Sequence, residues 1–203
     1  EQYIFKINDA YTNYRIYINN VFLGEVGKLD TSPQNSTPKF LMKEYPVYID
    51  AGNDTSVKTI EIILQVSNYH HIKSGMCFTP VFGKTSAVIN FIKDRYVLNM
   101  IIIGIILIIS FNHLIHFLYR RNDRSNLYFG ILCLVMILRN ITTDDHILVY
   151  WIPQISWEWL IRLDNFSGFG TVAIFALFLY VLFNKDFPYS VLFVIAGLGL
   201  IIS

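Results

Sequence analysis

The sequence predicts a membrane protein with two parts, an all-β sandwich of the jelly-roll kind followed by an all-α bundle of transmembrane helices. Charge divides the chain in the same way, because residues 1–96 hold ten Lys and Arg and nine Asp and Glu, whereas residues 97–203 hold six of each. Short alternating segments bounded by turn signals fill the first part. Residues 97–119 carry no charged side chain, and their centre consists of seven Ile, one Leu and one Gly, which is typical of a membrane span.

The bulk composition excludes several classes of protein. The net charge is +1 and no basic stripe alternates with aromatic residues, so nucleic acid is not an expected partner. No Ser/His/Asp arrangement, phosphate-cradling glycine loop or paired-carboxylate site is visible, so we predict neither an enzyme nor a cofactor for this stretch. Cys77 and Cys133 should lie on opposite sides of a membrane boundary, so we expect no disulfide bond.

Residues 1–93 form the expected extracytoplasmic domain. Tyr, Ile and Val alternate with polar residues in short runs that we interpret as strands, at residues 3–7, 14–18, 21–26, 46–49, 59–66, 77–82 and 85–90. Residues 59–66 alternate over the longest run and are the expected central strand. Asn19 and Asn20 predict a tight turn, because Asn tolerates a positive φ. Such a domain is small for a sandwich, so we expect further strands upstream in a longer protein.

Residues 94–203 form the expected membrane domain. As a helix, residues 97–119 measure about 34 Å, enough to cross a hydrocarbon core of about 30 Å, and their central Ile and Leu favour insertion by roughly 2 to 5 kcal/mol. Further spans are expected at residues 126–141, 158–183 and 188–203, the last one truncated. Arg120, Arg121 and Arg124 follow the first span. By the positive-inside rule they place that loop in the cytoplasm and the β domain outside.

Polar side chains inside the first span form one candidate coupling face. Asn112, His113 and His116 are spaced so that they can share one side of a helix. Polar groups in a span usually face the helix bundle. The sequence leaves three interpretations open: hydrogen bonds that fix helix packing, a haem or metal site, or a signalling relay.

A second polar set joins the second and third spans. Arg162 and Asp164 are two positions apart and cannot face each other on a helix. We therefore predict that Asp164 pairs with Arg139 across helices. Such a pair can hold the bundle together, or it can line a small-ligand pocket.

The loop after the expected central strand carries the candidate ligand residues Asn68, Tyr69, His70 and His71. A tyrosine ring can stack on a sugar, and Asn and His can hydrogen-bond to its hydroxyl groups. The alternative is a structural loop in which Asn68 satisfies its own backbone turn. No Cys or carboxylate stands at ligand spacing from the two His residues, so we predict no metal site.

Several local patterns occur in the order found in one receptor family. The family's patterns are Leu-Tyr-x-Asn-Gly…Gly, a strand ending in Val-Ser-Asn, a Leu-Gly strand pair, and Tyr-His-x-x-x-Tyr-x-x-Arg-Arg before Leu-Tyr-Phe. The similar segments here read YRIYINNVFLGEVGKLDTSP, IEIILQVSNYHHIKSGM, PVFGKTSAV and FNHLIHFLYRRNDRSNLYFGILCL. The chain thus resembles the bacterial seven-transmembrane receptors with diverse intracellular signalling modules. Asn20 and Ser74 depart from the family's glycines, which puts the local turn geometry in question.

The resemblance implies a galactose-binding-like jelly roll that takes a small ligand such as a saccharide. It also implies seven helices in the bacterial inner membrane, of which three and most of a fourth are present. A C-terminal cytoplasmic output module, such as a histidine kinase, a nucleotide cyclase or a phosphatase, would follow. Whether the chain forms a homodimer stays open.

The sequence therefore predicts the sensor and transmembrane-coupling part of a signalling receptor, with the lipid bilayer and a small molecule as partners. The first span would be the coupling helix, because only residues 91–96 separate it from the last expected strand. Two rivals stay open. One is a transporter or channel subunit with an outer cap, for which Gly168 and Gly170 are candidate helix breaks. The other is a membrane-embedded enzyme that uses His113 and His116.

Overall fold

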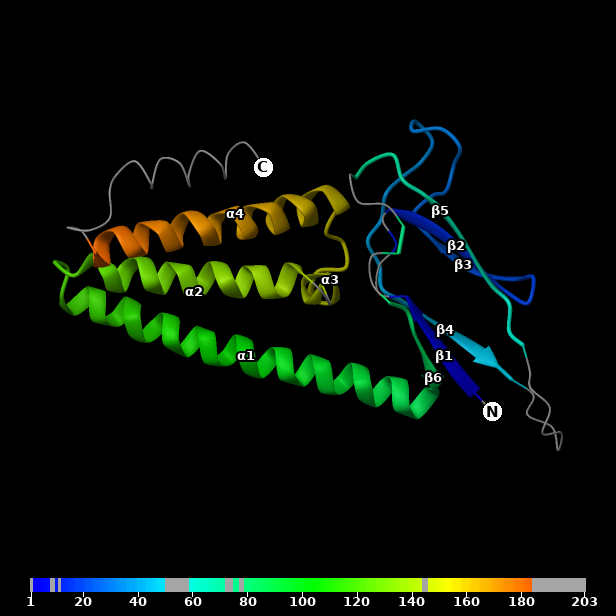
Figure 1. Cartoon of the computed structure of the whole chain (residues 1–203), viewed down its shortest axis with the longest axis horizontal. Coiled ribbons are helices and arrows are strands. Elements are labelled where there is room, and N and C mark those ends of the chain that lie inside the picture. Colours follow the sequence, from blue (N-terminus) through cyan, green and yellow to red (C-terminus); the bar gives the residue numbers. More distant parts are fainter. Residues whose placement is uncertain are drawn as a thin grey trace. The chain divides into compact units, whose positions relative to one another are not determined.

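The computed structural model describes residues 2–7, 10, 12–49, 59–71, 75–76, 79–143 and 146–183 (Figure 1). The strands are β1 (Gln2–Ile7), β2 (Asn13–Ile18), β3 (Val21–Val26), β4 (Lys43–Tyr48), β5 (Ile62–Ser67) and β6 (Val81–Lys84). The helices are α1 (Thr85–Tyr119), α2 (Arg124–Thr142), α3 (Ile147–Trp151) and α4 (Trp157–Leu182). The predicted fold class, a β domain followed by long apolar helices, is confirmed.

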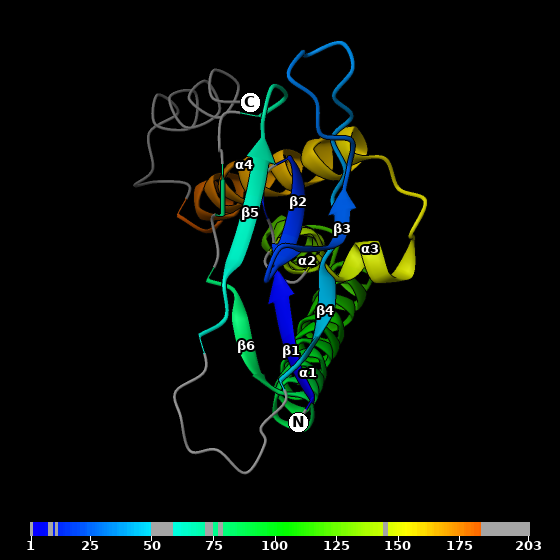
Figure 2. The same ribbon diagram turned by 90° about the vertical axis from the view of Figure 1, so that its right-hand side faces the viewer.

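The strands form two antiparallel sheets, in the orders β4-β1-β6 and β3-β2-β5 (Figure 2). The prediction of a central strand at residues 59–66 is wrong, because β5 begins at Ile62 and lies at the edge of its sheet. Its Ile63 is 38% exposed, as the outer face of an edge strand allows. Alternation reveals that a strand has one buried face, whereas its place in a sheet depends on pairing between distant residues.

Both sheets contribute to one hydrophobic core. Every second residue of the two central strands points into it, as the two-residue period of a strand requires. Its buried members are Phe5, Ile7, Ala10, Tyr14, Ile16, Ile18, Val26, Tyr45 and Val47. The hydroxyl of Tyr45 donates to the hydroxyl of Tyr14 at 3.3 Å, which joins one sheet to the other. Burial raises the pKa of Tyr45.

The turn between β2 and β3 confirms the prediction for Asn19 and Asn20. Both residues have positive φ angles, 48° and 63°, as in the mirror-image turns that suit the twist of hairpins. The side chain of Asn19 also accepts a hydrogen bond from the backbone N–H of Glu61 at 3.0 Å. The turn is therefore tied to the segment that leads into β5.

Helix α1 begins on the β domain itself. The prediction of a last strand at residues 85–90 is wrong, because β6 ends at Lys84 and the helix starts at Thr85. The hydroxyl of Thr85 donates to the backbone oxygen of Gln2 in β1 at 3.0 Å. Val88 is 3% exposed, and a Cβ on Gly83 would lie 3.3 Å from its side chain. A short apolar run cannot be assigned to strand or helix by periodicity alone, and here packing on the sheet favours the helix.

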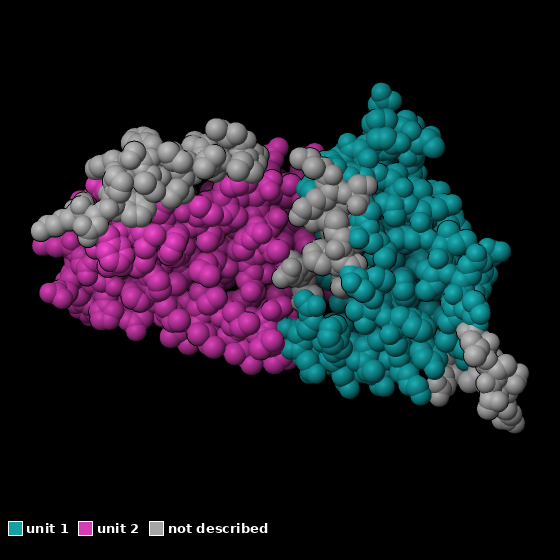
Figure 3. Space-filling model, in the orientation of Figure 1, with its two compact units in different colours: residues 1–95 teal, residues 96–203 magenta. Residues whose placement is uncertain are grey.

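Residues 91–96, which were expected to separate the last strand from the first span, lie inside α1. The chain divides into two compact units, Glu1–Arg95 and Tyr96–Ser203 (Figure 3). The helix therefore runs through the border between the units without a loop.

Three of the described helices, α1, α2 and α4, are long and apolar enough to cross a membrane. The expected spans at 97–119 and 126–141 lie within α1 and α2, and the one at 158–183 overlaps α4. The expected span at 188–203 lies outside the described residues. Large apolar side chains of the spans face outward, such as Ile108, which is 71% exposed. An apolar outer surface of this kind is suited to lipid.

Small residues let α1 and α2 approach each other closely. Ser110 is fully buried, and its hydroxyl donates to the backbone oxygen of Gly130 at 2.8 Å. A Cβ on Gly130 would lie 2.8 Å from the side chain of Leu114, closer than real Cβ contacts come. Small and hydroxyl-bearing residues are the usual contacts between membrane helices.

Candidate functional site

The loop that follows β5 is built around the side chain of Asn68. Its Oδ1 accepts from the backbone N–H groups of His70 and His71 at 3.1 and 3.0 Å, and its Nδ2 donates to the backbone oxygen of His71 at 2.6 Å. This matches the alternative interpretation from the sequence, a structural loop in which the Asn68 side chain hydrogen-bonds to the backbone of its own turn. The amide of Asn68 therefore shapes the loop.

Two aromatic side chains connect this loop to the loop between β3 and β4. The hydroxyl of Tyr69 donates to the backbone oxygen of Thr31 at 2.7 Å. The Nε2 atom of His70 lies 3.2 Å from the backbone oxygen of Ser36. Tyr69 as a whole is 45% exposed. Its hydroxyl is thus held in place while much of the residue stays at the surface.

The loop between β3 and β4 is itself strongly organised. Asp30 accepts hydrogen bonds from the backbone N–H and the hydroxyl of Ser32, and these hold the pKa of Asp30 below its ordinary value. Lys28 and Thr37 exchange backbone hydrogen bonds at 2.9 and 3.2 Å. Gly27 has a φ of +71°, and a Cβ there would lie 2.3 Å from Oδ1 of Asn13. The loop is therefore pre-organised, which lowers the entropy cost of binding a ligand.

Buried oxygen atoms without partners lie beneath these loops. The side-chain oxygens Oγ1 of Thr12, Oδ1 of Asn13 and Oγ of Ser67 are buried and have no hydrogen-bond partner among the described residues. Asn13 and Ser67 are opposite each other in the pairing of β2 with β5. Buried polar groups are nearly always paired, so these three oxygens need an explanation, such as a bound water or a functional role.

The helices hold a second polar cluster. Nη1 of Arg139 in α2 lies 3.1 Å from Oδ1 of Asp164 in α4, and the predicted ion pair is confirmed. The same nitrogen donates to the backbone oxygen of Asp164 at 3.1 Å, and the hydroxyl of Thr143 donates to the carboxylate at 2.8 Å. Gly168 leaves room for the guanidinium, since a Cβ there would lie 2.9 Å from Nη1.

A third group of polar side chains extends from α1 to the loop between α1 and α2. Nδ1 of His113 lies 2.8 Å from Oδ1 of Asn126, whose Nδ2 donates to Oδ2 of Asp123 at 2.9 Å. Of the three residues expected to share a face, His113 is half-buried, whereas Asn112 and His116 are exposed. The arrangement joins α1, the loop and α2, and its role in coupling stays a prediction.

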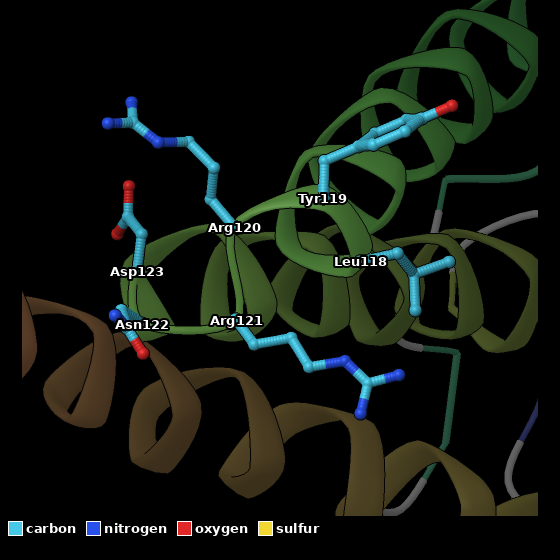
Figure 4. A pocket seen from close by; sticks show the side chains of 6 residues that line it. All are labelled: Leu118, Tyr119, Arg120, Arg121, Asn122 and Asp123. Carbon is cyan, nitrogen blue, oxygen red and sulfur yellow. The ribbon is translucent and has the colours of Figure 1, made fainter.

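The loop between α1 and α2 is an open basic concavity. Residues 118–123 line a hollow of about 780 Å³, and Figure 4 shows the side chains of Arg120 and Arg121 pointing to opposite sides of the loop. Asp123 caps α2 by accepting from the backbone N–H of Ser125 at 3.2 Å. The hollow is wide and solvent-facing, so it indicates a charged surface more than a ligand site.

The comparison with protein families decides the identity of the membrane part. A model of the family described as 7TM diverse intracellular signalling matches residues 95–203, more than half of the 203-residue chain. The chain belongs to this family. A comparison with curated proteins found no match, and neither did a comparison with solved structures. Membership in the 7TM signalling family shows a multi-pass membrane protein with a receptor-like role in signalling.

Some site residues of this 7TM signalling chain were not predicted from its sequence. Asn126 and Thr143 contact the predicted site residues His113 and Asp164, and Asp123 contacts Asn126; none of the three was predicted as a site residue. Asp123 had a usable signal, because Asp just before a helical run is a typical N-cap. The contacts of Asn126 with His113 and of Thr143 with Asp164 had none, because these partners lie on other helices.

Metal binding finds no support in the part of the chain that the structure describes. Within those residues, no group of three or more His, Cys, Asp or Glu could hold a metal ion. Cys133 is a free, buried cysteine of α2, and Cys77 lies outside the described residues.

Proposed function

We propose that this chain is the sensor and transmembrane-coupling part of a bacterial receptor of the 7TM signalling family. A small polar ligand, such as a saccharide, would bind the extracytoplasmic β domain. Helix α1 would carry the change to a C-terminal cytoplasmic output module, where any catalysis would take place. Arg120 and Arg121 between α1 and α2, with Arg124 at the start of α2, support an inner-membrane location with the β domain outside.

One observation carries the coupling proposal: β6 passes into α1 without a loop. Thr85 is hydrogen-bonded to β1, and Val88 is buried against the sheet. A change in this sheet would therefore reach the first turns of α1 directly. The same unbroken helix continues to Tyr119. Because no flexible linker interrupts it, a shift or rotation of its first turns is transmitted along the whole of α1.

The ligand is assigned to the loop pair formed by residues 28–37 and 68–71. Tyr69 offers an exposed ring whose position is set by its hydroxyl bond to Thr31. Stacking on a fixed aromatic ring suits a sugar, because little side-chain entropy is lost. The unpaired side-chain oxygens of Thr12, Asn13 and Ser67 are buried below the surface, so ordered water, rather than the ligand itself, can satisfy them.

The binding proposal is tested by thermal unfolding of the full chain in nanodiscs with a panel of monosaccharides and disaccharides. Ligand at about 100 times its dissociation constant should stabilise the folded state by about 2.7 kcal/mol. Tyr69→Ala should abolish that shift, whereas the control Tyr48→Ala should not, because Tyr48 is 77% exposed on β4. The proposal fails if no sugar stabilises the chain, or if Tyr69→Ala binds as well as the natural sequence.

The coupling proposal is tested by inserting two glycines between Lys84 and Thr85. Hydrogen exchange of residues 96–119 should respond to the stabilising sugar in the natural chain and not in the insertion variant. The same insertion in the exposed turn between Pro153 and Gln154 is the control and should preserve the response. An unchanged response after insertion at Thr85 would contradict coupling through α1.

A further inference from the structure

A groove lies between the three long helices, within the second unit. Its volume is about 520 Å³. Apolar side chains of α1 and α2 form one wall, and polar residues from α2 and α4 form the other. The lining residues are Ile102, Ile106, Met136, Arg139, Asn140, Thr143, Gly168 and Thr171. The groove thus combines an apolar wall with a charged one.

The charged wall is electrically balanced. Arg139 donates through Nη1 to Asp164, and its side chain is still 44% exposed. A guanidinium has five N–H donors, so most of the Arg139 donors are left for another acceptor. The carboxylate of Asp164 cancels the charge of the cation, so a ligand with a net negative charge would gain no net attraction from this wall. A neutral ligand that carries both charges fits this wall better.

An unpaired acceptor stands beside Arg139. The Oδ1 atom of Asn140 is buried and has no hydrogen-bond partner among the described residues, although Asn140 lines the groove. A buried acceptor without a donor is costly, so a donor brought to it is favourable. The terminal torsion of asparagine is broad, and binding requires that the amide turn to bring this buried oxygen to a donor in the groove.

The depth of the groove matches a lipid head group. Along their own helices, Ile102 lies about 26 Å from Tyr119, Arg139 about 22 Å from Arg124 and Gly168 about 21 Å from Leu182, at 1.5 Å per residue. All three ends lie at the side of the arginine loop. In a hydrocarbon core of about 30 Å, the groove then sits just inside the opposite boundary. The wall residue Met136 is 45% exposed, so the described residues leave this wall of the groove uncovered.

We propose that this groove binds a zwitterionic phospholipid whose head group carries a primary amine. The phosphate accepts hydrogen bonds from the remaining N–H groups of Arg139, and the ammonium donates to Oδ1 of Asn140. An acyl chain lies along Ile102, Ile106 and Met136. This lipid site is separate from the sugar site proposed on the β domain, and the lipid proposal does not depend on the sugar proposal.

The test compares lipids added to the purified full chain in an alkyl maltoside, whose head group has neither phosphate nor amine. The lipids are phosphatidylethanolamine, phosphatidylcholine and diacylglycerol with identical acyl chains, and binding is measured by native mass spectrometry and thermal unfolding. Choline has no N–H donor, so phosphatidylethanolamine should bind at least about tenfold more tightly than phosphatidylcholine. Diacylglycerol should give no shift. Soluble phosphoethanolamine is included to distinguish a free head group from a lipid.

Two variants locate the effect, with one matched control. Asn140→Leu removes the unpaired acceptor and should make the two phospholipids bind equally. Gly168→Ala places a methyl group 2.9 Å from Nη1 of Arg139 and should weaken both, whereas Gly170→Ala meets only Val135 at 3.5 Å and should bind as the natural chain does. Circular dichroism checks that each variant is folded.

Equal binding of the two phospholipids to the natural chain would overturn the proposal. So would an undiminished preference in Asn140→Leu, or a soluble head group that binds as well as the lipid. If both groove variants fail to fold, the comparison of lipids on the natural chain decides by itself.

Discussion

The ion pair between Arg139 and Asp164 should dominate the stability of the contact between α2 and α4. Asp164→Asn keeps an oxygen that can accept from Thr143, but it removes the negative charge and therefore leaves Arg139 without a counter-ion. Arg139→Met leaves the carboxylate without one. Each single change is expected to destabilise the chain, and the double variant is expected to lose clearly less than the two single losses added together, because two charges removed together leave nothing uncompensated.

The expected size follows from the geometry. With Nη1 and Oδ1 3.1 Å apart, the two charge centres lie about 4 Å from each other, and at an effective dielectric constant of 20 their attraction is about 4 kcal/mol. Hydrogen bonds between membrane helices contribute at most about 1.7 kcal/mol. We therefore expect each single variant to lose about 2 to 4 kcal/mol, with a coupling energy of about 2 to 3 kcal/mol in the double-mutant cycle.

The assay is reversible unfolding of the full chain in mixed micelles with increasing dodecyl sulfate, followed by circular dichroism. Arg162→Met is the control, because the guanidinium of Arg162 lies over the Trp159 ring at 5.5 Å and should cost at most about 1 kcal/mol. Losses that simply add in the double variant would refute a direct pairing of Arg139 with Asp164. Single losses no larger than the control would refute its importance.

Three further predictions concern the β domain in the full chain. Gly27→Ala should lower stability by about 2 to 5 kcal/mol, the sum of a left-handed backbone and a clash with Asn13, measured by thermal unfolding; a loss below 1 kcal/mol would contradict it. Asn20→Gly should raise stability by about 0.5 kcal/mol in the same assay, because glycine adopts positive φ freely; a lower melting temperature would count against the assigned turn. Asp30 has a pKa below its ordinary value of 3.8, so its contribution is present above that value and is lost as pH falls through the lower folded-state pKa. Ser32→Ala removes one donor, and carbon-13 titration of the carboxyl should then show a higher pKa.

The interpretation of the loop after β5 depends on a contact that links distant parts of the chain. Asn68, Tyr69, His70 and His71 were visible as a polar and aromatic cluster. Their sequence did not show that Asn68 is engaged within its own turn, or that Tyr69 and His70 reach Thr31 and Ser36. These contacts change the cluster from four equivalent candidates into one exposed ring on an organised support.

The sequence left a small-ligand pocket at Arg139 open as an alternative, but it did not show the other residues of the groove. Asn140 and Thr171 are ordinary residues within apolar helices, and Gly168 was considered only as a helix break. In the structure α4 continues through Gly168 unbroken, and the missing Cβ makes room for Arg139. Which face a residue presents to a neighbouring helix depends on helix rotation, and helix rotation is set by packing.

The sequence by itself determined the division into a β domain and apolar helices, the Asn-Asn turn and the pairing of Arg139 with Asp164. These features follow from local composition, from the φ preference of one residue type and from the cost of leaving a charge unpaired in lipid. Only the tertiary structure decided the strand order, the start of α1 at Thr85 and the groove beside Asn140. They depend on hydrogen bonds and packing between residues far apart in the chain, which a local pattern does not record.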